Sequence, residues 1–444
     1  MKLCKKDGGV FVVDIVKEWF SAKKIAITNV GKIVSGDINK GVIEGADTIF
    51  IENEKITYVG HESGIDLKDA EIIVDANGMV AIPGLIDCHT HLALENYAPM
   101  NGIVNCLEEA LMHGVTTIIS EGEQGHGLPR FYPWDPKGVK VTAILAKKIF
   151  ENYRPGGVQK VFGGALVLSE GLTEDDFKEL SEEGIWLIAE IGGGGLADVS
   201  KVLLMLEWAR KYNFFVSVHW GPGIIPGSRL FSVDEVLSMK PDKIAHVNGG
   251  TTAAPWEDTK EIIDKLDSGI EIVPYGNPRM IVKVLKYAKE KNILDRVIFG
   301  SDTPTGQGYL PNALHRAIVT ASSLAEIPAE KVIAMATGNT ARLYNKYGYR
   351  INSGFIEVGK DADIVLIDKP QGSVGEDALE AIEIGDTFGL ALIIASGKIV
   401  GLRGKDTRPT ERSIRINGTE IRVTDINELL FEPIKLYYRS LDLG

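Results

Sequence analysis

The stretch IPGLIDCHTH occupies residues 82–91 and ends in two histidines that are separated by one residue. Successive side chains of an extended strand point to opposite faces, so His89 and His91 lie on the same face. Two imidazoles placed in this way can hold one metal ion. Asp87 lies on that face too and is expected to orient a ligand. The stretch therefore predicts a strand, at residues 80–86, that is followed directly by metal ligands.

Beyond this stretch, apolar strand-like runs alternate with helical segments, which is the pattern of βα units and a parallel sheet. Helical segments include residues 198–212 and 278–292. Eight βα units over about 260 residues indicate an α/β fold, a (β/α)8 TIM-like barrel with its active site at the carboxyl ends of the strands. The eight predicted strands are residues 80–86, 116–120, 164–168, 186–190, 215–219, 243–247, 271–274 and 297–301.

Both ends of the chain carry short runs rich in Val, Ile and Thr between Gly, Asp and Asn, a composition typical of small β-structures. We expect the two ends to pair into one small β-sandwich domain. The predicted organisation has an N-terminal part of the sandwich at 1–80, the metal-dependent barrel at 81–350, the C-terminal part of the sandwich at 351–404 and an extension at 405–444. Within the extension, residues 408–425 alternate like an edge hairpin.

The composition narrows the function. The chain has 444 residues, of which 44% are hydrophobic and 25% charged, as in ordinary globular proteins. Its formal net charge of −13 disfavours partners such as nucleic acid or an anionic membrane. No apolar run approaches the roughly 20 residues of a membrane span. Three cysteines without CxxC spacing indicate neither a disulfide framework nor a thiolate zinc site. We therefore expect a cytoplasmic protein that acts on a small molecule.

Further metal-competent side chains follow the predicted strands. Each of them alone is as easily explained as a loop or cap residue. Buried imidazoles and carboxylates are costly unless they are paired or bound to a cation, so a cluster of six favours two divalent metal ions. The six are His89, His91, Glu190 after IWLIA, His219 after FFVSV, His246 in KIAHVNGG and Asp302 after RVIFGS.

The donor set also restricts the metal and the chemistry. Nitrogen and carboxylate ligands without thiolates suit zinc, iron, manganese or cobalt, and the order of metal affinities does not distinguish among them. Four neutral histidines and two carboxylates leave about two positive charges on such a pair of ions, or about one with a bridging hydroxide. That charge makes bound water a nucleophile at neutral pH.

These features together resemble the amidohydrolase superfamily over residues 25–404, including VGKDADIVLID at 358–368. The resemblance implies that His89 and His91 hold the more buried ion with Asp302, and that His219 and His246 hold the more exposed one. Many members bridge the ions with a carbamylated lysine after the fourth strand. Glu190 stands there in this chain, so the implied bridge is the Glu190 carboxylate together with hydroxide.

Within the superfamily, stretches such as ENYAP (95–99), HGVTTIIS (113–120) and MATGNT (335–340) are similar to a binuclear hydrolase of cyclic amides. This similarity implies cleavage of a cyclic amide C–N bond, as in ring opening of a 6-oxo-tetrahydronicotinate-type substrate, by a homo-oligomer, a tetramer. Asp302 is implied as the catalytic general base and acid. The residues expected to bind a substrate carboxylate are Tyr97, Arg130, Arg154 and Arg279.

The same residues also fit other functions. The loops after the first two strands, 91–102 and 121–134, depart from the cyclic amide hydrolase, which allows a different substrate. Deamination of an amino-heterocycle and hydrolysis of a dihydroorotate-like or hydantoin-like imide use the same kind of site. A non-catalytic scaffold is disfavoured, because a scaffold has no physical need for a costly cluster of polar groups.

Overall fold

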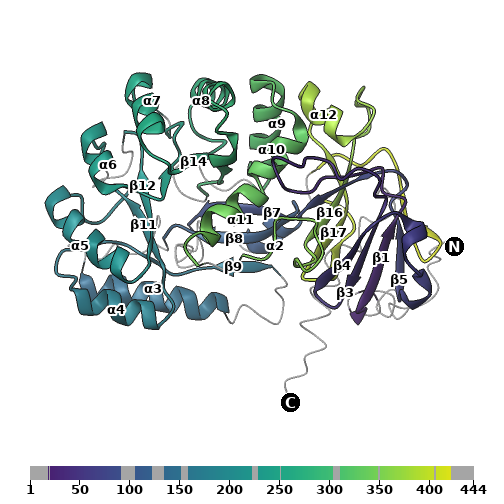
Figure 1. Ribbon diagram of the computed structural model, residues 1–444, viewed down its shortest axis with the longest axis horizontal. Coiled ribbons are helices and arrows are strands. Elements are labelled where there is room, and N and C mark those ends of the chain that lie inside the picture. The colour runs from purple at the N-terminus through teal and green to yellow at the C-terminus, as the bar shows by residue number, and fades with distance from the viewer. Residues whose placement is uncertain are drawn as a thin grey trace, which may run out of the picture.

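The computed structural model describes residues 19, 21–91, 106–122, 135–151, 159–222, 229–250, 252–303, 311–348, 351–404 and 407–421. It is a mixed α/β fold in two parts: parallel strands surrounded by helices, and two layers of mostly antiparallel strands beside them (Figure 1). Within these residues, none of the helices has the length and apolar character that crossing a bilayer requires.

The parallel part contains two sheets, ordered β7-β8-β9 and β10-β11-β12-β13-β14-β15. The short strands β9 and β10 follow one another along the chain and pair with β8 and β11, so they join the two sheets. The bounds are β7 (Leu85–Thr90), β8 (Val115–Ser120), β9 (Lys160–Phe162), β10 (Ala165–Leu166), β11 (Leu187–Ile191), β12 (Phe215–His219), β13 (Lys243–Ala245), β14 (Gly269–Ile272) and β15 (Val297–Phe299).

The first and last parallel strands are connected at their carboxyl ends. Thr90 and Thr303 form a parallel bridge, the Asp302 amide donates to the His89 carbonyl, and the His91 amide donates to the Thr303 carbonyl. Within the described residues, β7 and β15 themselves are not paired as strands. The backbone after β15 is thereby tied to the histidine-bearing end of β7.

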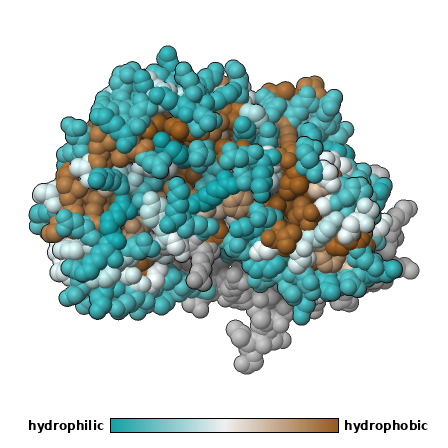
Figure 2. Space-filling view, in the orientation of Figure 1, coloured by the Kyte–Doolittle hydropathy of each residue, from teal (hydrophilic) through white to brown (hydrophobic). Residues whose placement is uncertain are grey.

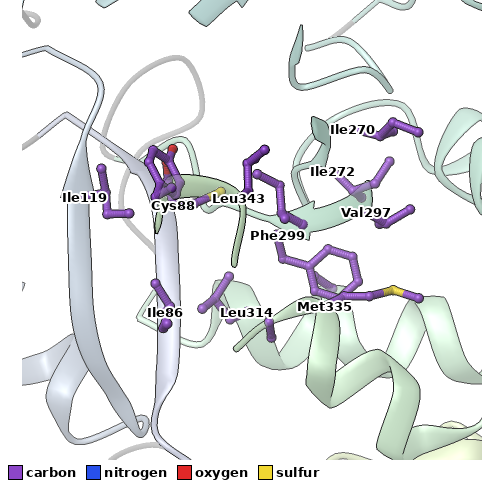
Figure 3. Close-up of a cluster of buried hydrophobic side chains, with 14 of the residues drawn as sticks. Ile86, Cys88, Ile119, Ile270, Ile272, Val297, Phe299, Leu314, Met335 and Leu343 are labelled. Atoms are coloured by element: carbon purple, nitrogen blue, oxygen red, sulfur yellow. The ribbon is translucent and has the colours of Figure 1, made fainter. Parts of the chain in front are cut away.

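Helices cover the outside of the parallel strands, with α4 to α9 following one another around them (Figure 1). Side chains from α9, α10 and α11 pack against β7 and β15, as Leu314, Met335 and Leu343 show (Figure 3). The helices are α2 (Cys106–Leu111), α3 (Pro136–Glu151), α4 (Glu174–Glu182), α5 (Val199–Lys211), α6 (Val233–Met239), α7 (Trp256–Lys265), α8 (Pro278–Glu290), α9 (Ala313–Ala325), α10 (Ala329–Met335), α11 (Gly338–Asn345) and α12 (Ala378–Ile384). Hydrophilic residues cover most of these helices, and hydrophobic ones appear in the recesses between them (Figure 2).

The second part consists of two layers that share one apolar cluster, to which Ile27, Val74, Leu366 and Ile394 belong. Both ends of the chain contribute to each layer, as the composition predicted. One layer has the order β20-β19-β5-β1-β3-β4, with β1 (Lys24–Thr28), β3 (Thr48–Glu52), β4 (Lys55–Gly60), β5 (Ile72–Asp75), β19 (Ile414–Ile416) and β20 (Thr419–Ile421). The other has the order β18-β17-β16-β6-β2, with β2 (Lys32–Ile33), β6 (Val80–Pro83), β16 (Ile364–Asp368), β17 (Gly389–Ala395) and β18 (Lys398–Gly401).

The stretch IPGLIDCHTH passes from one part of the protein to the other. The single strand predicted at 80–86 is wrong, because β6 pairs with β16 in the layered part whereas β7 pairs with β8 in the parallel part. Gly84 separates them, and a Cβ atom there would lie 2.2 Å from Oγ1 of Thr116. The chain changes sheets at a point where only glycine fits.

One other strand prediction needs correction, and the hairpin predicted near the C-terminus has a further partner. The strand expected at 164–168 is present only at Ala165–Leu166, and β9 was missed because Gly164, at a φ of 96°, interrupts the segment. The expected hairpin near the C-terminus is confirmed as β19 and β20. It is not separate from the layers, however, because β19 pairs with β5.

Candidate metal centre

The six predicted metal ligands meet at the carboxyl ends of the parallel strands. Their ligand atoms form two groups of three, and within each group all of them lie within 4.8 Å of one another. Neighbouring parallel strands end at the same edge, which is why residues far apart in the sequence can converge there. The groups are His89, His91 and Asp302, from β7 and the turn after β15, and Glu190, His219 and His246, from β11, β12 and the turn after β13.

In the first group, His89 of β7 and His91, which directly follows this strand, face each other as the strand alternation predicted. The Nε2 atoms of His89 and His91 are 3.0 Å apart. Oδ1 of Asp302 lies 3.5 Å from the first and 3.3 Å from the second. Three ligand atoms therefore surround one point.

In the second group, one carboxylate oxygen serves both histidines. Oε2 of Glu190 lies 3.2 Å from Nδ1 of His219 and 2.8 Å from Nε2 of His246. The other oxygen, Oε1, lies 3.9 Å from Nε2 of His91, which belongs to the first group. Glu190 thus stands between the two groups, with one oxygen toward each.

The partners of the remaining ring nitrogens show that this donor set fits cations. Nδ1 of His91 contacts the carbonyl of Gly122 at 3.1 Å, and Nδ1 of His246 contacts the carbonyl of Trp220 at 3.0 Å. A carbonyl only accepts hydrogen bonds, so both Nδ1 atoms carry a proton, and Nε2 of each ring has a lone pair whenever the ring is neutral. Lone pairs and carboxylate oxygens that converge repel one another unless a proton or a cation lies between them.

Two of the six ligands have strained backbones. His246 has a φ of 33° and Asp302 a φ of 54°, both in the left-handed region that side chains other than glycine seldom adopt. His246 directly follows β13, and Asp302 lies three residues after the end of β15. Strain of this kind is typical of functional sites, where the surrounding fold holds a side chain in place.

Electrostatic effects in the centre are strong. Burial opposes the charged form of His246, but the adjacent Glu190 carboxylate prevails and raises the pKa of His246 to about 9. Burial likewise opposes ionisation of Glu190, yet His219 and His246 hold the pKa of Glu190 well below its usual range. The pKa of Asp302 is lowered against burial by His89 and His91. Without cations the cluster therefore holds protons that cations would displace.

A second set of buried charges lies behind the ligands and was missed from the sequence. Nζ of Lys243 lies 2.6 Å from Glu121 and 2.5 Å from Glu271, and Nδ1 of His89 lies 2.7 Å from Glu271. A signal was present, since Glu271 and Lys243 are charged residues within apolar strands. Asp87, which was expected to orient a ligand, accepts hydrogen bonds from the backbone amides of the ligand residue His89 and of Ser301.

These buried groups change the charge balance expected from the six ligands. Burial raises the pKa of Asp87 to about 6, so this carboxyl is mostly ionised at neutral pH. Asp87, Glu121 and Glu271 against Lys243 add a net of two negative charges around the centre. The residual charge of about two inferred from the six ligands alone is thereby largely neutralised.

The expected substrate-binding residues are not tested by this geometry. Tyr97, Arg130 and Arg154 lie outside the described residues. Arg279 is exposed in the first turn of α8. All four stay predictions.

Parallel strands that end in two histidine–carboxylate groups define the class of metal-dependent hydrolases with an α/β fold. A family model described as "Amidohydrolase family" matches residues 243–400. Enamidase of Eubacterium barkeri is 41% identical over 396 residues, which cover 88% of this chain and 99% of that protein. The chain belongs to the amidohydrolase family and is a hydrolase.

Other comparisons agree. A crystal structure of enamidase superimposes with a TM-score of 0.82 at 40% identity, covering 88% of this chain and 100% of that one. Imidazolonepropionase of Kosmotoga olearia is 25% identical over 410 residues, covering 77% of this chain and 91% of that protein. The similarity to enamidase extends over both parts of the fold.

Proposed function

We propose that this chain hydrolyses the C–N bond of a cyclic amide with the help of two divalent cations. The observation that carries the proposal is the position of Glu190, whose two oxygens face the two separate groups of ligands. The identity of 41% with enamidase over nearly the whole of that protein supports a cyclic amide as the substrate class.

The two groups are proposed to hold one cation each, zinc or iron, with manganese or cobalt as alternatives. The Glu190 carboxylate would lie between the cations together with a hydroxide. When bound, two such cations supply a nucleophile from water at neutral pH and polarise the carbonyl that it attacks.

Asp302 is proposed as the general base and acid. Its side chain is 24% exposed, whereas those of the other five proposed ligands are between 0% and 12% exposed. A carboxylate at the open side of the centre can take a proton from water and pass it to the departing nitrogen. It must be ionised to do so, and its lowered pKa meets that condition at neutral pH.

The finer substrate assignment follows from the same similarity. We propose a six-membered ring amide with a carboxylate, of the 6-oxo-tetrahydronicotinate type, whose carboxylate would bind among Tyr97, Arg130, Arg154 and Arg279. A guanidinium recognises a carboxylate through two parallel hydrogen bonds, which suits the arginines to this role.

The remaining structural assignments are proposals as well. The hydrogen bonds between β7 and the segment after β15 support closure of the parallel strands into a (β/α)8 barrel. The apolar cluster shared by the two layers supports a β-sandwich domain built from both chain ends. A homo-oligomer, a tetramer, is proposed from the resemblance, and a cytoplasmic location from the cysteine content and composition.

The test is turnover by protein loaded with zinc or iron. A six-membered cyclic enamide with a ring carboxylate, the same ring without it, an amino-heterocycle, dihydroorotate and hydantoin are compared, with ring opening and ammonia release as readouts. We expect ring opening of the carboxylated enamide. Preferential deamination of the amino-heterocycle, or turnover of the imides alone, would refute the substrate class. A folded protein that binds no divalent ion would refute the proposed centre itself.

A further inference from the structure

The buried charges behind the ligands, Lys243, Glu121 and Glu271, form a continuous series of contacts that reaches the first ligand group. Lys243 donates to Glu121 and to Glu271, and Glu271 contacts the His89 ring through its other oxygen. The side chains of Lys243, Glu121 and Glu271 are all 0% exposed. Nζ of Lys243 also donates, at 3.3 Å, to the carbonyl of Cys88, the residue that directly precedes His89. Glu271 is therefore held at both oxygens, by Lys243 at Oε2 and by the His89 ring at Oε1. Oε1 also accepts from the backbone amide of His246 at 3.2 Å, but Glu271 has its ring contact with His89 and not with His246.

This series of contacts gives the histidines of the two ligand groups different partners. The second nitrogen of His89 faces a carboxylate, whereas those of His91 and His246 face the carbonyls of Gly122 and Trp220. A carboxylate partner makes the imidazole a more basic ligand than a carbonyl partner does. Two carboxylates against one ammonium also leave one negative charge buried among Lys243, Glu121 and Glu271. A buried charge is costly unless it is compensated, and a cation at His89 compensates it.

We infer that Glu271, held by Lys243 and Glu121, is a positioning residue that orients His89 and makes the His89–His91–Asp302 group the tighter of the two cation sites, the one that fills first. The inference rests on the proposed two-cation centre. It assigns an order of loading to that centre and a role to three residues that are not themselves ligands.

Zinc affinity of the metal-free protein, measured by competition with a chelator, tests this order. To isolate the first site, His219→Ala removes a ligand of the other group, and Glu271→Gln is added to this background. Gln keeps the size of Glu271 but removes its charge. We expect the affinity of the first site to fall ten- to a hundred-fold. In the otherwise unchanged protein, Glu271→Gln should weaken binding of the first zinc ion by a similar factor and binding of the second by less than threefold.

Two further variants separate this effect from a loss of folding. Glu121→Gln leaves the contact between Glu271 and His89 in place and removes the excess buried charge, so a smaller decrease, about three- to tenfold, is expected. Asp363→Asn is the matched control, since Asp363 is a fully buried carboxylate paired with Lys160 away from the centre. Its zinc affinity should equal that of the unchanged protein.

The outcomes distinguish the inference from the proposed function. An unchanged protein that binds no zinc refutes the centre. An unchanged protein that binds two zinc ions overturns only the inference if folded Glu271→Gln or folded Glu121→Gln binds the first ion with undiminished affinity. Equal weakening by Asp363→Asn also overturns it, because the effect would then be a general consequence of disturbing a buried ion pair.

Discussion

Metal binding should be coupled to proton release at His246. In the metal-free protein the Glu190 carboxylate, 2.8 Å from Nε2 of His246, raises the pKa of this histidine to about 9. The same nitrogen is the proposed ligand atom, so a cation must displace its proton. Because pH 7 lies about two units below this pKa, His246 is almost fully protonated there, and each unit corresponds to about 1.4 kcal/mol. Displacing the proton costs about 3 kcal/mol, roughly a hundred-fold loss of apparent affinity.

The sign of the pH dependence follows from this competition. Apparent affinity for the ion in the second group should rise about tenfold per pH unit between pH 7 and 9 and level off above pH 9. The stability of the metal-free fold changes with pH in the opposite direction. A raised pKa stabilises the fold fully below the unfolded value of about 6.5, and this contribution is lost as the pH rises through 9.

Titration calorimetry in buffers of different ionisation enthalpy measures the protons released per ion, and chelator competition from pH 6.5 to 9.5 measures the affinity. We expect close to one proton from the second group at pH 7. The control is the same titration of the unchanged protein at pH 9.5, above the pKa of His246, where the number of protons released per ion should fall well below one. Affinity that does not vary with pH in the unchanged protein would refute this reasoning.

Three other predictions concern separate parts of the molecule. Asp302→Asn should retain most of its metal but lose turnover at least a hundred-fold, whereas Glu190→Ala should lose metal on dialysis; metal analysis beside an activity assay checks both. Burial lowers the pKa of His315 to about 3, so unfolding takes up a proton below pH 6.5 and the free energy of unfolding should fall by about 2 kcal/mol between pH 7 and 5. Urea unfolding tests this, and His315→Gln should flatten the slope. Gly84→Ala should cost about 1–3 kcal/mol by overpacking against Thr116, with part recovered by Thr116→Ala.

The ligand set was predictable because its determinants are local. Strand alternation alone places His89 and His91 on one face, and their Nε2 atoms are 3.0 Å apart. Glu190 and His219 each follow an apolar run, and neighbouring parallel strands end at one edge. Which residues share a cation, in contrast, depended on the family resemblance.

The parts that could not be predicted depend on distant partners. The boundary between β6 and β7 is set by the pairing of β6 with β16, far along the chain, and within residues 80–90 only the Pro83-Gly84 pair indicates a break. Glu271 and Lys243 were visible as charges in apolar strands. Only the three-dimensional structure shows that Glu271 is paired with both Lys243 and His89.

The passage of IPGLIDCHTH between the two parts has a consequence for synthesis on the ribosome. Strand β6 lies in its sheet between β2, which is translated earlier, and β16, which is translated only after all of the parallel strands. The segment that bears His89 is thus anchored last on one side. Expression of residues 81–350 alone would leave this anchor without its neighbour, and the excised fragment should aggregate rather than fold.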